Sequence, residues 1–114
     1  MAKGLNFREF AQPTLPITMN DAEGTLFTVT APTVALTERL AANIDAMLEI
    51  FKSGNMTAVE EIWKLAADLI SCNREGRHVT AEDLKGRYGM SHAMLYAFMI
   101  AHMEFTHEIE NAKN

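Results

Sequence analysis

The sequence has very little cysteine and little positive charge. Cys72 is the single cysteine among 114 residues, so no disulfide can form within the chain, which fits either a reducing cytoplasm or a protein with no use for thiols. Ten basic side chains stand against fifteen acidic ones, which gives a net charge of −5 at pH 7. Nucleic-acid-binding domains and proteins of anionic membrane surfaces both need basic residues to contact phosphate. We therefore expect neither nucleic acid nor a membrane as a partner.

Long apolar runs are also missing. The longest stretch without Asp, Glu, Lys or Arg extends from Tyr88 to Met103, and it is shorter than the roughly 20 residues that span a membrane. Residues 1–6 lack the apolar core of a signal peptide. These absences predict a soluble, cytoplasmic protein. A chain of 114 residues, 48% of them hydrophobic, predicts one folded domain over residues 1–114.

Motifs that carry catalysis or bind metal are not found. The sequence contains no Gly-x-Ser-x-Gly, no phosphate-binding glycine loop and no His-Glu-x-x-His. His102 and His107 are five residues apart, whereas a helical zinc pair is spaced by four. We expect His102 to be a core histidine with a satisfied ring nitrogen. Cys72 follows a predicted helix, whose dipole disfavours a reactive thiolate there. The sequence thus predicts no enzyme activity, no metal and no cofactor.

The N-terminal part of the chain has the pattern of an arm followed by a β-hairpin. Residues 1–13 are mixed in character and end at Pro13, which predicts an arm. Two short runs with β-branched residues, 15–19 and 25–30, flank the turn-forming Asn20-Asp21-Ala22-Glu23-Gly24. This pattern predicts a β-hairpin over residues 14–31, with Pro16 at an edge. A lone hairpin is marginally stable in water, so it must pack on other elements.

Residues 32–112 have the periodicity of helices. Thr33 is the predicted N-cap of a first helix that Gly54 ends, and a capping box at Thr57 opens a second helix. Thr80 starts a short third helix, and Ser91 caps a fourth that runs to about Ile109. The expected apolar face of the first helix is Leu36, Leu40, Ile44, Met47, Leu48 and Phe51. That of the second helix is Val59, Ile62, Trp63, Ala66, Leu69 and Ile70. The fold class is therefore mainly α (α+β), a short N-terminal hairpin followed by a bundle of three to four helices.

The last helix has more apolar surface than one core face requires. At 100° per residue it presents three stripes: Met94, Leu95, Phe98, His102, Phe105 and Ile109; then Tyr96, Met99, Ile100 and Met103; then Ala93, Ala97, Ala101, Glu104 and Glu108. Either this helix is central and covered on both sides, or the second stripe meets another chain. Methionine suits adaptable apolar contact. The candidate protein-interface residues are Met90, Tyr96, Met99, Ile100 and Met103.

Residues 81–98 are similar to a helix-turn-helix. A glycine turn precedes a Ser-capped helix with a Leu-Tyr pair, as in many bacterial repressors. A recognition helix presents Arg, Lys, Asn or Gln to bases and phosphates, but residues 91–110 contain none of these. A small helix-turn-helix regulator, acting through protein contacts or less readily through DNA, is therefore the alternative interpretation.

The order of segments resembles a known family, the small tail assembly chaperones of long-tailed bacteriophages and prophages. The resemblance covers most of the chain, from the arm and hairpin to the end of the final helix. It rests on Asn6-Phe7-Arg8-Glu9-Phe10, Thr30-Ala31-Pro32-Thr33, Asn73-Arg74-Glu75-Gly76, Val79-Thr80-Ala81-Glu82-Asp83-Leu84 and Glu108-Ile109-Glu110-Asn111-Ala112-Lys113-Asn114.

The resemblance implies a non-enzymatic protein of the host cytoplasm that is absent from the mature virion. Such chaperones bind the long, helical tape measure protein and promote assembly of the tail tube around it. The tape measure protein is thus the implied partner, and the tail tube protein and a second copy of this chain stay open as further ones. An acidic, non-catalytic chain with a methionine-rich helix is compatible with that role.

Overall fold

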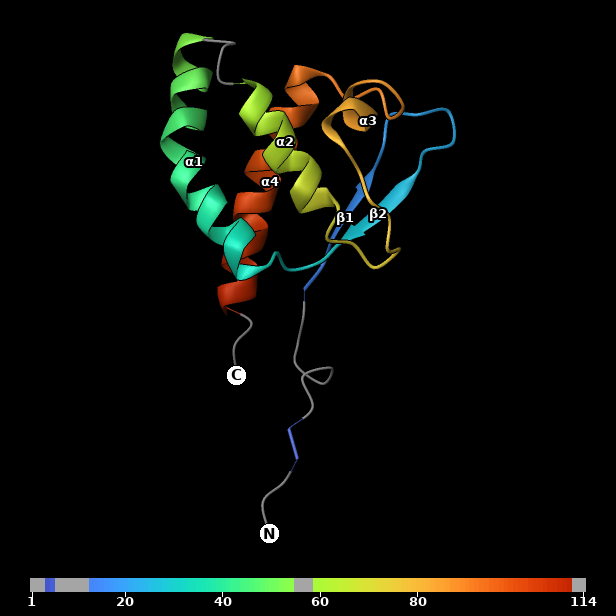
Figure 1. Cartoon of the computed structure of the whole chain (residues 1–114), viewed down its shortest axis with the longest axis vertical. Helices are drawn as coiled ribbons and strands as arrows, with labels where there is room; N and C mark the ends of the chain where they lie inside the picture. Colours follow the sequence, from blue (N-terminus) through green and yellow to red (C-terminus); the bar gives the residue numbers. More distant parts are fainter. Residues whose placement is uncertain (1–3, 6–12, 55–58, 112–114) are drawn as a thin grey trace.

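The computed structural model describes residues 4–5, 13–54 and 59–111. Within these ranges an antiparallel hairpin precedes four helices (Figure 1). The strands are β1 (Leu15–Thr18) and β2 (Leu26–Val29), and the helices are α1 (Val34–Ser53), α2 (Val59–Ile70), α3 (Ala81–Lys85) and α4 (His92–Asn111). The expected mainly helical fold with an N-terminal hairpin is confirmed. Most of the predicted arm and the capping box at Thr57 lie outside the described residues.

The hairpin is closed by the turn that its sequence predicts. Ile17 pairs with Phe27 and Thr18 with Leu26, and Gly24 takes a φ of 60° in the connecting loop. Asp21 accepts the Thr25 N–H at 2.8 Å and the Thr25 hydroxyl, and these bonds lower the pKa of its carboxyl. A glycine at positive φ with an aspartate bonded back to the loop backbone is a common solution for such turns.

The outer edge of β2 is covered by the segment that follows α2. The Thr30 N–H donates to the Cys72 carbonyl at 2.8 Å, and the Arg74 N–H donates to the Thr28 carbonyl at 3.0 Å. The Glu75 carboxylate accepts both the N–H and the hydroxyl of Thr28 at 2.8 Å, and these bonds lower its pKa. Among the described residues, no segment pairs with the outer edge of β1. Within the described part of the chain, the hairpin therefore has one open edge.

The predicted caps set the ends of α1. The Leu36 N–H donates to Thr33 Oγ1 at 3.2 Å, and Gly54 ends the helix with a φ of 68°. Leu40, Met47 and Ile50 are buried, but Leu48 is 47% exposed, so its expected place in the core is wrong. Leu48 lies about 100° around the helix from Met47, toward solvent. The side chain of Phe51 lies outside the described part.

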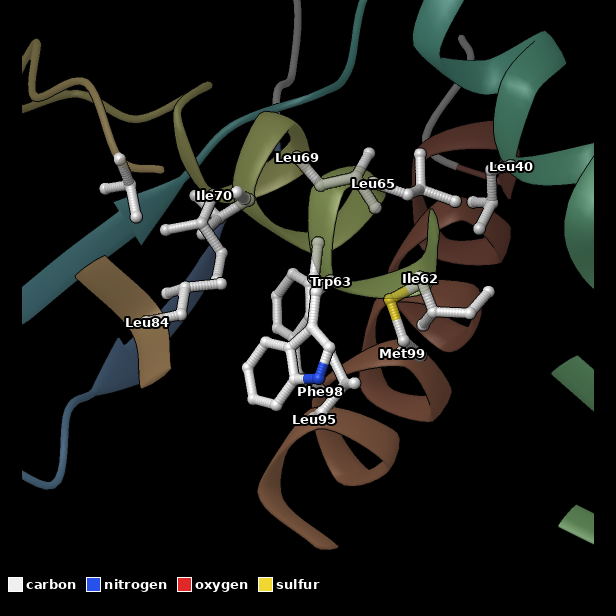
Figure 2. Close-up of a cluster of buried hydrophobic side chains, with 14 of the residues drawn as sticks. Leu40, Ile62, Trp63, Leu65, Leu69, Ile70, Leu84, Leu95, Phe98 and Met99 are labelled. Carbon is white, nitrogen blue, oxygen red and sulfur yellow. The ribbon is translucent and has the colours of Figure 1, made fainter. Parts of the chain in front are cut away.

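The central helix of the bundle is α2. It contacts α1, α3, α4 and β2, and it contributes Ile62, Trp63, Leu65, Leu69 and Ile70 to the core (Figures 1 and 2). Its smaller side chains, Ala66 and Ala67, are buried as well. Burial on several sides requires apolar residues around most of the helix rather than on one face. The interpretation that the last helix is the central one is therefore wrong, because α2 takes that place.

Local capping also determines how α3 and α4 begin. Thr80 and Asp83 form a reciprocal capping box at the start of α3, and the bonds from Thr80 lower the pKa of Asp83. At the start of α4, the Met94 N–H donates to Ser91 Oγ at 3.2 Å, as predicted. Between the helices Gly89 has a φ of 63°, a conformation that favours glycine. This turn lies against the hairpin loop, where the Asn20 side-chain amide donates to the Gly89 carbonyl at 3.3 Å.

Candidate protein-binding groove

An apolar groove separates β1 from α4. It has a volume of about 410 Å³, which lies in the range of ligand and peptide sites. Of the described residues that line it, none carries a charge. Its wall on the hairpin side is Ile17, Thr18, Met19 and Asn20; the α3–α4 turn adds Tyr88 and Met90; and α4 adds Met94, Ala97, Phe98 and Ala101. We call this feature the β1–α4 groove.

The α3–α4 turn, which lines one end of the groove, is held by backbone hydrogen bonds and ring packing. The Met90 N–H donates to the Leu84 carbonyl at 2.8 Å, and the Tyr88 N–H donates to the Asp83 carbonyl at 2.9 Å. The Tyr88 ring packs edge-on against Phe27, with 5.4 Å between the ring centroids. Because the two hydrogen bonds fix the α3–α4 turn on α3 and the ring contact joins it to the hairpin, the groove is a preformed feature of the fold.

Methionine side chains come to the groove from three parts of the chain. Met19 is buried at the end of the hairpin strand, Met90 is half-buried in the turn, and Met94 is 40% exposed on α4. Unbranched thioether side chains can adopt several shapes without strain, and they pack well against varied apolar partners. The groove therefore offers adaptable apolar contact rather than polar recognition.

Two small side chains form part of the α4 wall. Ala97 is exposed and Ala101 is half-buried, one helical turn apart. Alanines at this spacing leave room for another backbone to approach a helix closely. Any larger side chain at Ala97 would project into the space that a partner would need.

The open edge of β1 offers little to an added strand. The Met19 N–H donates to the Thr25 carbonyl at 2.8 Å, so Met19, Ile17 and Leu15 direct their backbone groups toward β2. The alternate residues, Pro16 and Thr18, direct theirs outward, and proline has no N–H to donate. A proline at this position is a recognised way to prevent strand addition at an edge.

The structure divides the predicted interface residues among three places. Met90 lies in the β1–α4 groove. Tyr96 and Met103 are half-buried and Ile100 is 44% exposed on the opposite flank of α4. Met99 has no exposed surface and lies in the core cluster that also holds Ile62 of α2 (Figure 2). Its expected place on a partner surface is corrected to the core.

The reason for this division is that the buried arc of α4 is centred on the first predicted stripe and extends over its border to Met99 of the second. Leu95, Phe98, Met99, His102 and Phe105 are the buried residues of the helix. Met94, which the periodicity assigned to the core, is displaced to the edge of that arc and faces the groove. The groove residues that the sequence reading missed include Ala97 and Ala101. The signal in the sequence that could have indicated them is the four-residue spacing of Ala93, Ala97 and Ala101 on one stripe of the helix.

His102 is a core residue whose expected hydrogen bond is missing. Its ring lies between those of Phe98 and Phe105, with centroids at 5.6 Å and 5.5 Å, and the residue has no exposed surface. Neither ring nitrogen has a hydrogen-bond partner among the described residues, so the expected satisfied nitrogen is wrong. Burial among apolar groups disfavours the charged imidazolium and lowers the pKa of His102 to about 4.

Other chemistry in the described part of the chain gives no competing site. The described residues hold no cluster of three His, Cys, Asp or Glu side chains suited to a metal ion. Nor do they hold a helix that is both long and apolar enough to cross a bilayer. A second, polar depression beside α1 and α2 holds Arg39, which pairs with Asp68 at 2.6 Å and with Glu61 at 3.8 Å.

The region that is similar to a helix-turn-helix forms two helices with a glycine turn between them. The first of these, α3, has only five residues, and its Leu84 is buried against the core. Several exposed residues of α4, namely Ala93, Met94, Ala97, Ile100, Glu104 and Glu108, are apolar or acidic. A DNA-reading surface requires basic or amide side chains at these positions.

Comparison of the chain with protein-family models, with curated proteins and with solved structures finds no match.

Proposed function

We propose that this protein is a non-enzymatic tail assembly chaperone of a long-tailed bacteriophage or prophage. In this role it binds the tape measure protein in the host cytoplasm, promotes assembly of the tail tube around it, and leaves before the virion is complete. The resemblance noted in the sequence supports the class. The observation that carries the proposal in the structure is the β1–α4 groove, an open apolar surface of a protein with a net charge of −5.

The groove suits a client that is long, helical and apolar along one face. Such a client aggregates when its apolar face meets water, and a chaperone must cover that face without selecting one exact sequence. Methionines supply contacts that adjust to different side chains. Charged residues elsewhere on the surface keep a coated client dispersed.

The test is co-expression of the chain with its proposed client, the tape measure protein, which we expect to be encoded by a long, helix-rich reading frame near the gene of this chain. We expect the client to be insoluble by itself and to form a soluble complex with this chain in gel filtration. Ala97→Arg places a charge in the groove wall and should abolish the complex, because a buried unpaired charge opposes apolar contact.

The matched control is Ala42→Arg, which makes the same change at an exposed site of α1. It should retain the complex, and both variants should unfold at the temperature of the parent protein. The proposal is wrong if no long helical frame lies near the gene, or if the client is equally soluble without the chain.

A further inference from the structure

The groove runs along the axis of α4 rather than across it. Met94, Ala97 and Ala101 line it over two turns, a length of about 10 Å at 1.5 Å per residue. The opposite wall is the end of β1 and the hairpin loop. A groove that follows a helix over two turns suits a rod-shaped occupant, and the rods that proteins present are helices and strands.

A strand is the poorer occupant. Strand addition gains its affinity from main-chain hydrogen bonds along the edge. Here the outward-facing residues of β1 are Pro16 and Thr18, so the strand can offer a single N–H to an added chain. A helix satisfies its own main-chain groups and needs only apolar contact from the groove. The small Ala97 and Ala101 let it approach closely.

Charge distinguishes one end of the groove from the other. Glu104 and Glu108 continue the line of Ala97 and Ala101 along α4, all four within an arc of about 60°. Both glutamates are exposed, and within the described part of the chain neither belongs to an ion pair. Near the other end Arg87 lies over the Tyr88 ring, 5.3 Å from its centroid. The groove is therefore lined by uncharged residues, and the surface of α4 that follows it toward the C-terminus is acidic.

We propose that the β1–α4 groove binds an amphipathic helix whose apolar ridge fills the groove and whose lysine or arginine residues pair with Glu104 and Glu108. The inference rests on the proposed function for the identity of the client, but it is a statement about recognition that does not depend on a phage origin. It adds the charge of the bound segment and the two carboxylates that pair with it.

The test uses two fluorescein-labelled peptides of about 20 residues, each with leucine at the i, i+3, i+4 and i+7 positions. One carries lysine beside the leucine ridge and the other carries glutamate. We expect the lysine peptide to bind and to gain helicity by circular dichroism. The glutamate peptide should bind at least about tenfold more weakly at low salt, and added salt should narrow the difference.

The double variant Glu104→Lys with Glu108→Lys should weaken the lysine peptide about fivefold and strengthen the glutamate peptide. Its matched control, Glu38→Lys with Glu49→Lys, changes the net charge equally on exposed sites of α1 and should alter neither affinity. Equal binding of both peptides, or equal effects of the two double variants, would overturn the charge pairing. If neither peptide bound, the helical occupant would be overturned, and the co-expression experiment would still judge the chaperone role separately.

Discussion

His102 makes the core of this protein sensitive to acid. It is a buried histidine between two phenylalanine rings, and within the described residues its nitrogens have no hydrogen-bond partner. A buried polar group without a partner lowers stability relative to an apolar residue of similar size. The neutral ring is tolerated, whereas the imidazolium is not, and this is why the pKa falls to about 4.

We predict that acid destabilises the protein through this residue. A histidine with a pKa of about 4 in the folded state and an ordinary value of 6.5 binds its proton more readily when the chain unfolds. Stability is therefore full above pH 6.5 and declines as the pH falls toward 4. Urea unfolding should show a loss of about 2 kcal/mol from His102 between pH 7 and pH 4.5.

The comparison that isolates this residue is His102→Leu, which keeps the volume and removes the titrating ring. Its unfolding free energy should decline less between the same pH values, by about 2 kcal/mol. The carboxyls of Asp21, Glu75 and Asp83 have lowered pKa values, so their ionised forms also stabilise the fold. That stabilisation is lost at lower pH to the same extent in the parent protein and in His102→Leu. Parallel pH profiles of the two proteins would show that His102 is not the cause.

Among the secondary-structure elements, the junction between the hairpin loop and the α3–α4 turn holds the groove in shape. Gly89 has a φ of 63°, and a Cβ there would lie 3.1 Å from the Asn20 carbonyl oxygen. Gly76 has a similar φ of 69°, but its Cβ would meet nothing within 4 Å. A substitution at either glycine would therefore strain the backbone, and a substitution at Gly89 would also place its Cβ too close to Asn20.

We predict that Gly76→Ala lowers the unfolding free energy by about 1 kcal/mol, the penalty of a left-handed conformation. Gly89→Ala should lower it by about 2 kcal/mol, because the hairpin loop must also move away. Urea unfolding of both variants measures the difference, and Gly89→Ala should in addition weaken binding of the lysine peptide. Equal losses in the two variants would mean that the junction does not constrain the groove.

Features set by neighbouring residues in the chain could be predicted from the sequence, and features set by distant packing could not. Thr33, Thr80 and Ser91 cap helices as expected because a cap needs only the next three residues. The place of Met99 depends on which flank of α4 meets α2, and periodicity does not specify that. The candidate site is therefore recovered in part: Met90 was found, but its partners Met19 and Ala97 come from packing across the fold.

For the whole molecule, the question is which side of α4 meets the client. The side toward β1 is grooved and carries Met90 and Met94, and the opposite flank carries Tyr96, Ile100 and Met103. A grooved side with adaptable side chains gives more contact than a convex flank. Methionines lie in the groove, on the opposite flank of α4 and in the core, so their methyl signals can show in one experiment which of these places a client contacts.

The most direct test is an NMR titration of protein labelled at the methionine methyl groups with the helical client. We predict shifts at Met90 and Met94 on binding, and smaller ones at Met19, because these residues line the groove. Met47 and Met99 are buried elsewhere in the core and should remain unchanged. Shifts at Met103 with none at Met90 and Met94 would place the client on the opposite flank and contradict the groove as the binding site.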